Sequence, residues 1–143
     1  MLLSKEVAVY LNLAGCKLKQ YTSNVLKRNN VGLTPEQFLL IDILWNQGPM
    51  SQQCLADTMQ KDKNSITKLV DGLEKKGLLV REKNMEDRRS NTVVLTHAAQ
   101  AMKEDTKEKG IFMLDRILEG IPEDELRAFL GTLGKILQRM EES

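Results

Sequence analysis

The feature that most constrains the fold of this chain is a change of hydrophobic period near residue 78. Up to Gly77, apolar residues recur at the three- and four-residue spacing of amphipathic helices. Two short β-rich runs follow, Leu78–Arg81 and Thr92–Leu95. The polar stretch between them, Glu82–Asn91, is too long for a two-residue hairpin turn, so we expect two strands joined by a projecting loop. The fold class predicted is mainly α with a small β-element.

Four helices are predicted before the strands. The first covers residues 3–28, where apolar side chains follow helical spacing. Three residues that favour N-cap positions open the next three helices: Thr34, Ser51 and Asp62. Pro35 suits the first helical position, and Gln37 suits the reciprocal position of a capping box. Nothing in the sequence accounts for Gly72 inside the fourth helix, where glycine costs about 1 kcal/mol relative to alanine.

Two further helices are predicted after the strands. Thr96 caps one that runs to Leu118, and the last covers Leu126–Met140. Two helices joined by a tight turn at Gln60 and Lys61, and followed at once by a two-stranded ribbon, are typical of a winged helix-turn-helix.

We therefore predict one domain over the whole chain. The winged helix-turn-helix occupies residues 34–96, and the helices of residues 1–30 and 111–143 form a dimerisation region. At 143 residues the chain is too short for two ordinary domains.

Charge is distributed unevenly along a chain whose formal net charge is only +1. Residues 1–30 carry five basic groups and one acidic group, and residues 61–90 carry nine basic and six acidic groups. Residues 115–143 carry four basic and seven acidic groups. This segregation allows a positive surface to face phosphate, although solvated helix faces of mixed sign would give the same counts.

The first turns of the fourth helix carry the side chains expected to read DNA. The second helix of a helix-turn-helix enters the major groove with its N-terminal residues toward the bases. The residues expected to contact DNA here share polar or basic side chains: Lys63, Asn64, Ser65, Thr67 and Lys68. Ser51 and Lys61, near the starts of the two helices, are expected phosphate contacts. The alternative is that these residues only keep an exposed turn soluble.

The predicted loop holds two adjacent arginines, Arg88 and Arg89. Arginines at the tip of a hairpin suit a narrow, electronegative minor groove. Asp87 supports them in this interpretation, because a carboxylate can hold an arginine in place before DNA binds.

With these motifs in view, the sequence resembles the multiple antibiotic resistance regulator (MarR) family over nearly its whole length. The resemblance is carried by five segments: Leu33–Phe38, Leu55–Ala56, Ser65–Leu78, Asp87–Ser90 and Leu95–Thr96. It implies an obligate homodimer that binds palindromic operators in double-stranded DNA, usually as a repressor released by a small-molecule effector or by oxidation. The family's wing pattern of Asp, any residue and Arg falls on Asp87 and Arg89.

Leftover apolar residues also favour a homodimer. Apolar residues near the start (Leu3, Val7, Val9 and Leu11) and the stripe from Leu126 to Met140 exceed what a winged-helix unit covers. A closed monomeric bundle is the alternative.

Several classes of protein are disfavoured. No apolar run is long enough to span a membrane, no signal peptide is recognisable, and two widely spaced cysteines fit a reduced cytoplasmic setting. No nucleophile–base pair or phosphate-binding glycine loop is present, so we expect neither an enzyme nor a cofactor. His97 has no partner at ligand spacing, so we expect no metal site.

Two alternative functions stay open. Cys16 lies where oxidant-sensing members of the family carry a reactive cysteine, but they place a tyrosine four positions later, where this chain has Gln20. We interpret Cys16 as a buried, inert thiol and Cys54 as a core residue. A winged helix can also bind proteins instead of DNA. A wing that binds proteins would show exposed apolar side chains, and Met85 is the one such group expected in this loop.

Overall fold

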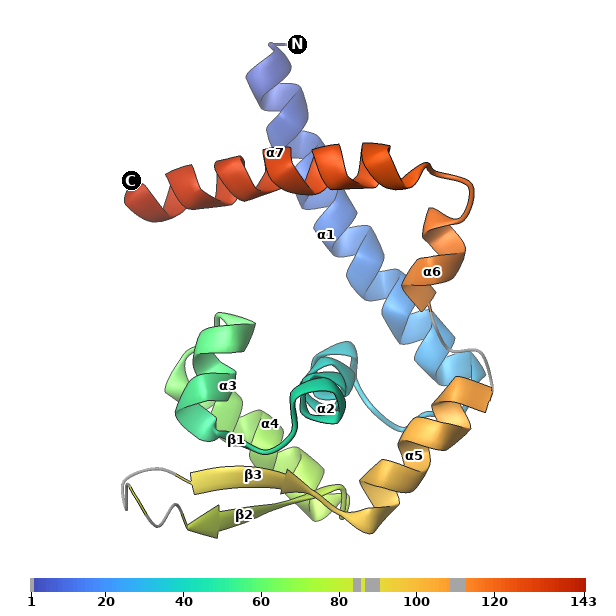
Figure 1. The fold of residues 1–143 in the computed structure, drawn as a ribbon, viewed down its shortest axis with the longest axis vertical. Coiled ribbons are helices and arrows are strands. Elements are labelled where there is room, and N and C mark those ends of the chain that lie inside the picture. Colours follow the sequence, from blue (N-terminus) through green and yellow to red (C-terminus); the bar gives the residue numbers. More distant parts are fainter. Residues whose placement is uncertain (1, 84–85, 87–90, 109–112) are drawn as a thin grey trace. The chain divides into compact units, whose positions relative to one another are not determined.

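The computed structural model describes residues 2–83, 86, 91–108 and 113–143 (Figure 1). The helices and strands of the described residues are, in chain order, α1 (Leu3–Arg28), α2 (Pro35–Gln47), β1 (Met50–Ser51), α3 (Gln52–Met59), α4 (Lys63–Lys75), β2 (Leu79–Lys83), β3 (Asn91–Leu95), α5 (His97–Glu108), α6 (Met113–Leu118) and α7 (Glu123–Glu142). The predicted class, mainly α with a small sheet, is confirmed. The chain divides into two compact units, residues 1–111 and 112–143, which we describe separately.

The three predicted N-caps are confirmed. Thr34 Oγ1 accepts a hydrogen bond from the Gln37 amide (3.2 Å), and the Thr34 amide donates to Gln37 Oε1 (3.1 Å), which completes the capping box. Ser51 Oγ accepts from the Cys54 amide at 3.0 Å. Asp62 Oδ1 accepts from the Ser65 amide at 2.6 Å. These local bonds satisfy backbone donors that a helix start leaves open, and they fix where α2, α3 and α4 begin.

The small sheet has three antiparallel strands in the order β1-β3-β2 (Figure 1). β2 and β3 pair from Leu79 opposite Leu95 to Lys83 opposite Asn91, so the ladder extends further toward the loop than the sequence predicts. The two-residue strand β1 was not predicted. It pairs Met50 with Val93 and ties the start of α3 to the sheet.

A single apolar core joins α2, α3, α4 and α5 to the sheet of the first unit. Its fully buried large side chains come from five elements: Leu40, Ile41, Leu55, Ile66, Val70, Leu73, Leu79 and Val93. Trp45 Nε1 donates to the Ala99 carbonyl at 3.0 Å, which fixes α5 against α2. Burial on this scale anchors α4 and the strands to one another without help from any other chain.

Gly72 is explained by the approach of α2 to α4. A Cβ at this position would lie 3.0 Å from Gln37 Nε2. The Gln37 side chain is held there, because its Oε1 also accepts a hydrogen bond from Lys76 Nζ at 2.9 Å. Glycine therefore lets the capping box of α2 lie against the α4 backbone.

The second unit exposes most of its apolar residues. In α7 only Leu126, Leu133 and Ile136 are half-buried, and the other residues of this helix are exposed. α5 and α6 both lie within the predicted helix 97–118, and the residues between them, 109–112, fall outside the described part of the chain.

None of the described helices combines the length and the apolar character needed to cross a bilayer. No group of three or more potential metal ligands occurs among the residues that the structure describes.

Candidate nucleic-acid interface

The turn between α3 and α4 is short and well fixed. Gln60 adopts a left-handed conformation (φ 54°), and the Lys61 amide donates to the Ala56 carbonyl at 3.0 Å. α4 then begins at Lys63, with Asp62 as its cap. The hydrogen bond from the Ser65 amide lowers the pKa of Asp62, so this carboxylate stays charged at the helix start.

The predicted reading residues separate into two groups by exposure. Lys63, Asn64 and Lys68 are exposed, and Asn64 and Lys68 are one helical turn apart on the same face. Ser65 and Thr67 are half-buried. The first turns of α4 therefore present two ammonium groups and one amide to solvent, which suits contacts to phosphates and base edges.

Two of the predicted phosphate contacts already have partners within the chain. The Lys61 ammonium lies 3.2 Å from Glu36 Oε1 at the start of α2, and Lys19 of α1 reaches the same carboxylate at 3.5 Å. The hydrogen bond from Lys61 lowers the pKa of Glu36. Ser51 Oγ is used as the N-cap of α3. Whether Lys61 and Ser51 also contact phosphate stays a prediction.

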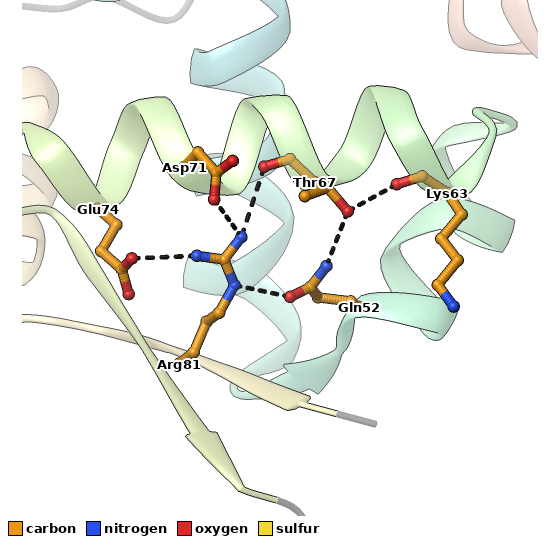
Figure 2. Close-up of polar contacts among 6 residues, drawn as sticks. All are labelled: Gln52, Lys63, Thr67, Asp71, Glu74 and Arg81. Atoms are coloured by element: carbon orange, nitrogen blue, oxygen red, sulfur yellow. Dashed lines mark hydrogen bonds and ion pairs between the residues drawn. The ribbon is translucent and has the colours of Figure 1, made fainter. Parts of the chain in front are cut away.

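Arg81 was not predicted, and it forms the centre of the polar contacts between the wing strands and the helices (Figure 2). Its Nη2 lies 2.6 Å from Asp71 Oδ1 and its Nη1 lies 3.0 Å from Glu74 Oε1, both on α4. Its Nε donates to Gln52 Oε1 of α3 at 2.8 Å. β2, α3 and α4 therefore meet at one guanidinium group. The sequence offered one signal for this role. Arg81 comes two residues after Leu79 in a strand, so it occupies an inward position next to a helix that carries Asp71.

Thr67 belongs to the same cluster (Figure 2). Its hydroxyl donates to the Lys63 carbonyl at 2.9 Å and lies 3.5 Å from Gln52 Nε2, and its own carbonyl lies 3.4 Å from Arg81 Nη2. Thr67 thus helps to hold α3, α4 and β2 together, whether or not it also contacts DNA.

The open end of the β2–β3 ladder lies at Lys83 and Asn91. The three residues predicted for the wing tip, Asp87, Arg88 and Arg89, lie outside the described residues.

Both cysteines were predicted to be buried, and this prediction was wrong for the single chain. Cys54 is exposed, whereas the buried residues of α3 are its neighbours Leu55 and Ala56. Cys16 is also exposed, since α1 buries Leu26 near its end and leaves the surroundings of Cys16 open to solvent.

Comparisons with known proteins converge on one family. The MarR family model matches residues 33–91, which run from just before α2 to the start of β3. The transcriptional regulator MgrA of Staphylococcus aureus is 24% identical over 127 residues, covering 87% of this chain and 82% of MgrA. Residues 33–91 thus match the MarR family, and most of the chain is similar to a transcriptional regulator.

Solved structures of similar proteins share the fold. CouR of Rhodococcus jostii RHA1, solved bound to p-coumaroyl-CoA, is 26% identical with a TM-score of 0.77, and the match covers 95% of this chain and 94% of CouR. Reduced AbfR bound to DNA is 22% identical with a TM-score of 0.76, covering 96% of this chain and 94% of AbfR. The fold described above thus matches MarR winged-helix structures, and the similarity to MarR-family regulators supports a DNA-binding transcriptional regulator.

Proposed function

We propose that this MarR-family chain is a homodimeric repressor that binds a palindromic operator and releases it when a small molecule binds. The observation that carries the proposal is the exposed set Lys63, Asn64 and Lys68, presented at the start of α4 beside an antiparallel wing. In this geometry α4 enters a major groove while Arg88 or Arg89 of the wing enters the flanking minor groove, with Asp87 holding the arginine. AbfR, which has a similar fold and was solved bound to DNA, supports DNA binding by this chain.

The homodimer is supported by apolar residues that the single chain leaves exposed. α1 exposes Leu3 (75%) and Val9 (51%), and α7 exposes Phe129 (59%) and Leu130 (63%). Burying such residues between two copies removes apolar surface from water. Two-fold symmetry then presents two α4 helices to half-sites about 34 Å apart, one turn of duplex.

The test of DNA binding is a titration of labelled duplex with the Lys68→Ala, Arg89→Ala double variant. Each neutralised phosphate releases counterions, so wild-type affinity should fall steeply with salt and the variant should show a shallower dependence. Arg89→Ala alone should cost about 1–3 kcal/mol of binding free energy. Lys135→Ala on α7, which also removes one positive charge, is the control. An equal loss in the control would contradict the proposal.

We place the effector near α1, α2 and α5, where binding would alter the separation of the two α4 helices. CouR, solved with a bound acyl-CoA, supports a small-molecule effector. On α2, Leu39 is 48% exposed, and burial raises the pKa of the nearby Asp42. A compound that releases the operator should lose its effect in Leu39→Arg, while operator affinity without the compound is unchanged. Release that persists in this variant would place the effector elsewhere.

Oxidant sensing is a second candidate because Cys16 is exposed in the single chain. If Cys16 senses oxidant, Cys16→Ser should abolish peroxide-induced release from DNA, and Cys54→Ser should not. Unchanged release in Cys16→Ser would remove this candidate.

A further inference from the structure

Arg81 occupies the inward position at which the wing leaves the apolar core. Leu79 is fully buried and Val80 is 42% exposed, and alternate residues of a strand point to opposite faces, so Leu79 and Arg81 share the inner face of β2. Leu79 packs in the core, whereas Arg81, two residues closer to the loop, contacts α4 through polar groups. At Arg81, therefore, ion pairs and hydrogen bonds hold β2 to α4 in place of apolar packing.

The contacts of Arg81 require the planar guanidinium. Asp71 and Glu74 each take a separate terminal nitrogen, and Gln52 takes Nε, so three directions are fixed at once (Figure 2). A lysine carries one point charge and cannot satisfy these three acceptors together. The two carboxylate side chains are 50% and 43% exposed, so solvent screens the ion pairs and their contribution to folding stability is small. The main effect of the cluster is therefore to fix the orientation of β2 relative to α4.

The two carboxylates lie on the helix that is proposed to read DNA. Asp71 and Glu74 follow Lys63 and Lys68 along α4, and free carboxylates near a duplex repel its phosphates. Counting charges alone therefore predicts that removing both carboxylates tightens DNA binding. A role in holding the wing predicts the opposite result.

We propose that Arg81 is a positioning residue for DNA binding, which acts with Asp71 and Glu74 to fix the orientation of the wing relative to α4. The inference rests on the proposed function. An untied wing loses orientational freedom when it enters the minor groove, whereas a tied wing has lost it already, so the cluster raises affinity for the operator without touching it. Non-specific binding depends on phosphate neutralisation and needs no fixed angle between wing and helix.

Three variants test this proposal. Asp71→Asn with Glu74→Gln keeps the size of both side chains and removes two negative charges. Arg81→Lys keeps the net charge and removes the planar fork. Glu82→Gln removes one negative charge from the outward face of the same strand and is the matched control. Each is titrated with the duplex that the wild-type chain selects from random sequence and with a scrambled duplex of equal length.

The double carboxylate variant and Arg81→Lys should each bind the selected duplex about tenfold more weakly, although neither becomes more negative. For the scrambled duplex, where affinity depends on phosphate neutralisation alone, Arg81→Lys should stay within about twofold of wild type, and the double carboxylate variant, which has lost two negative charges, should bind as tightly as wild type or more tightly. Amide hydrogen exchange should become faster at Lys83 and Asn91, at the open end of the ladder, and stay unchanged at Leu79. The thermal unfolding temperature should change little, which separates positioning from stability.

Equal or tighter binding of the selected duplex by the double carboxylate variant, or wild-type affinity in Arg81→Lys, would overturn the proposal. A parallel loss for the selected and the scrambled duplex would also overturn it, because a general loss of charge or of folded protein would then explain the effect. If the wild-type chain selects no duplex at all, the proposed function fails and the role of Arg81 in DNA binding fails with it. Selection by wild type with unaffected variants removes the Arg81 proposal alone.

Discussion

The winged helix-turn-helix and the terminal helices bury their apolar residues in different ways. Within α2 to β3, side chains such as Leu55, Leu73 and Val93 are fully buried in the single chain. In α7 no residue is buried, although its apolar stripe is nearly as pronounced as that of α4. The first region completes its core alone, whereas the second carries an apolar face that one copy leaves in water.

This difference separates two tasks. A core closed within one chain holds α4, β2 and β3 in fixed relation, which a DNA-reading surface requires. In the proposed homodimer, the open apolar face is covered by the partner copy, and the proposed effector acts by changing how the two reading units are spaced. The predictions below test this contrast.

The largest effect should come from the closed core. Leu55→Ala removes a fully buried side chain of α3 and should lower the free energy of unfolding by about 2–5 kcal/mol, because a cavity remains in the apolar core. Urea unfolding at fixed protein concentration measures this. A loss below about 0.5 kcal/mol would show that the core of a single chain is less well packed than its burial indicates.

A substitution on the open apolar face should weaken assembly of the dimer. Leu130→Glu places a charge on the exposed apolar stripe of α7 and should raise the dimer dissociation constant at least tenfold, about 1.4 kcal/mol. Sedimentation velocity across a concentration series measures the dissociation constant. Thr132→Glu, on an exposed polar position of the same helix, is the control and should leave it unchanged. The same dissociation constant in Leu130→Glu and wild type would contradict a role of α7 in the dimer.

A smaller effect is expected at the capping box of α2. Thr34→Ala leaves the Gln37 amide without its side-chain acceptor and should cost about 1 kcal/mol of folding free energy. Thr34→Ser keeps the acceptor and should recover most of the loss. Equal losses in both variants, measured by urea unfolding, would mean that the hydroxyl contributes nothing.

The smallest effect concerns pH. Asp62 and Glu36 have lowered pKa values, so the stability they contribute is present above their usual values of 3.8 and 4.5 and is lost as pH falls through their folded values. Asp42 has a raised pKa, so its contribution is present at low pH and lost as pH rises. Between about pH 5 and pH 3, Asp62→Asn should therefore flatten the loss of stability and Asp42→Asn should steepen it. The reverse order of slopes would contradict these assignments.

The elements predicted correctly from sequence depend on neighbours along the chain. The caps could be predicted because each bonds an amide only three residues ahead: Thr34, Ser51 and Asp62. The helical spacing of apolar residues predicted α1 to α4. The strand β1 was missed because its two residues become a strand only by pairing with Val93 and Thr92, about forty positions later.

The site was predicted only in part for the same reason. The exposure of Lys63 and Lys68 could be predicted because both lie on the polar face of α4. Arg81 was missed because its partners lie on two helices, up to 29 positions away, and basic residues near a wing suggest DNA before they suggest a structural ion pair. Cys54 was misassigned because one step along a short helix turns a side chain by about 100°, which is enough to move it out of the core.

The central claim is that two copies of the α4–wing surface read one duplex. The most direct measurement is selection of binding sites from random duplex DNA by the wild-type chain, at two salt concentrations. The account predicts an enriched palindrome with half-sites about one helical turn, roughly 34 Å, apart, and affinity that falls steeply with salt. Enrichment of a single non-repeated half-site, or no enrichment at either salt concentration, would contradict it.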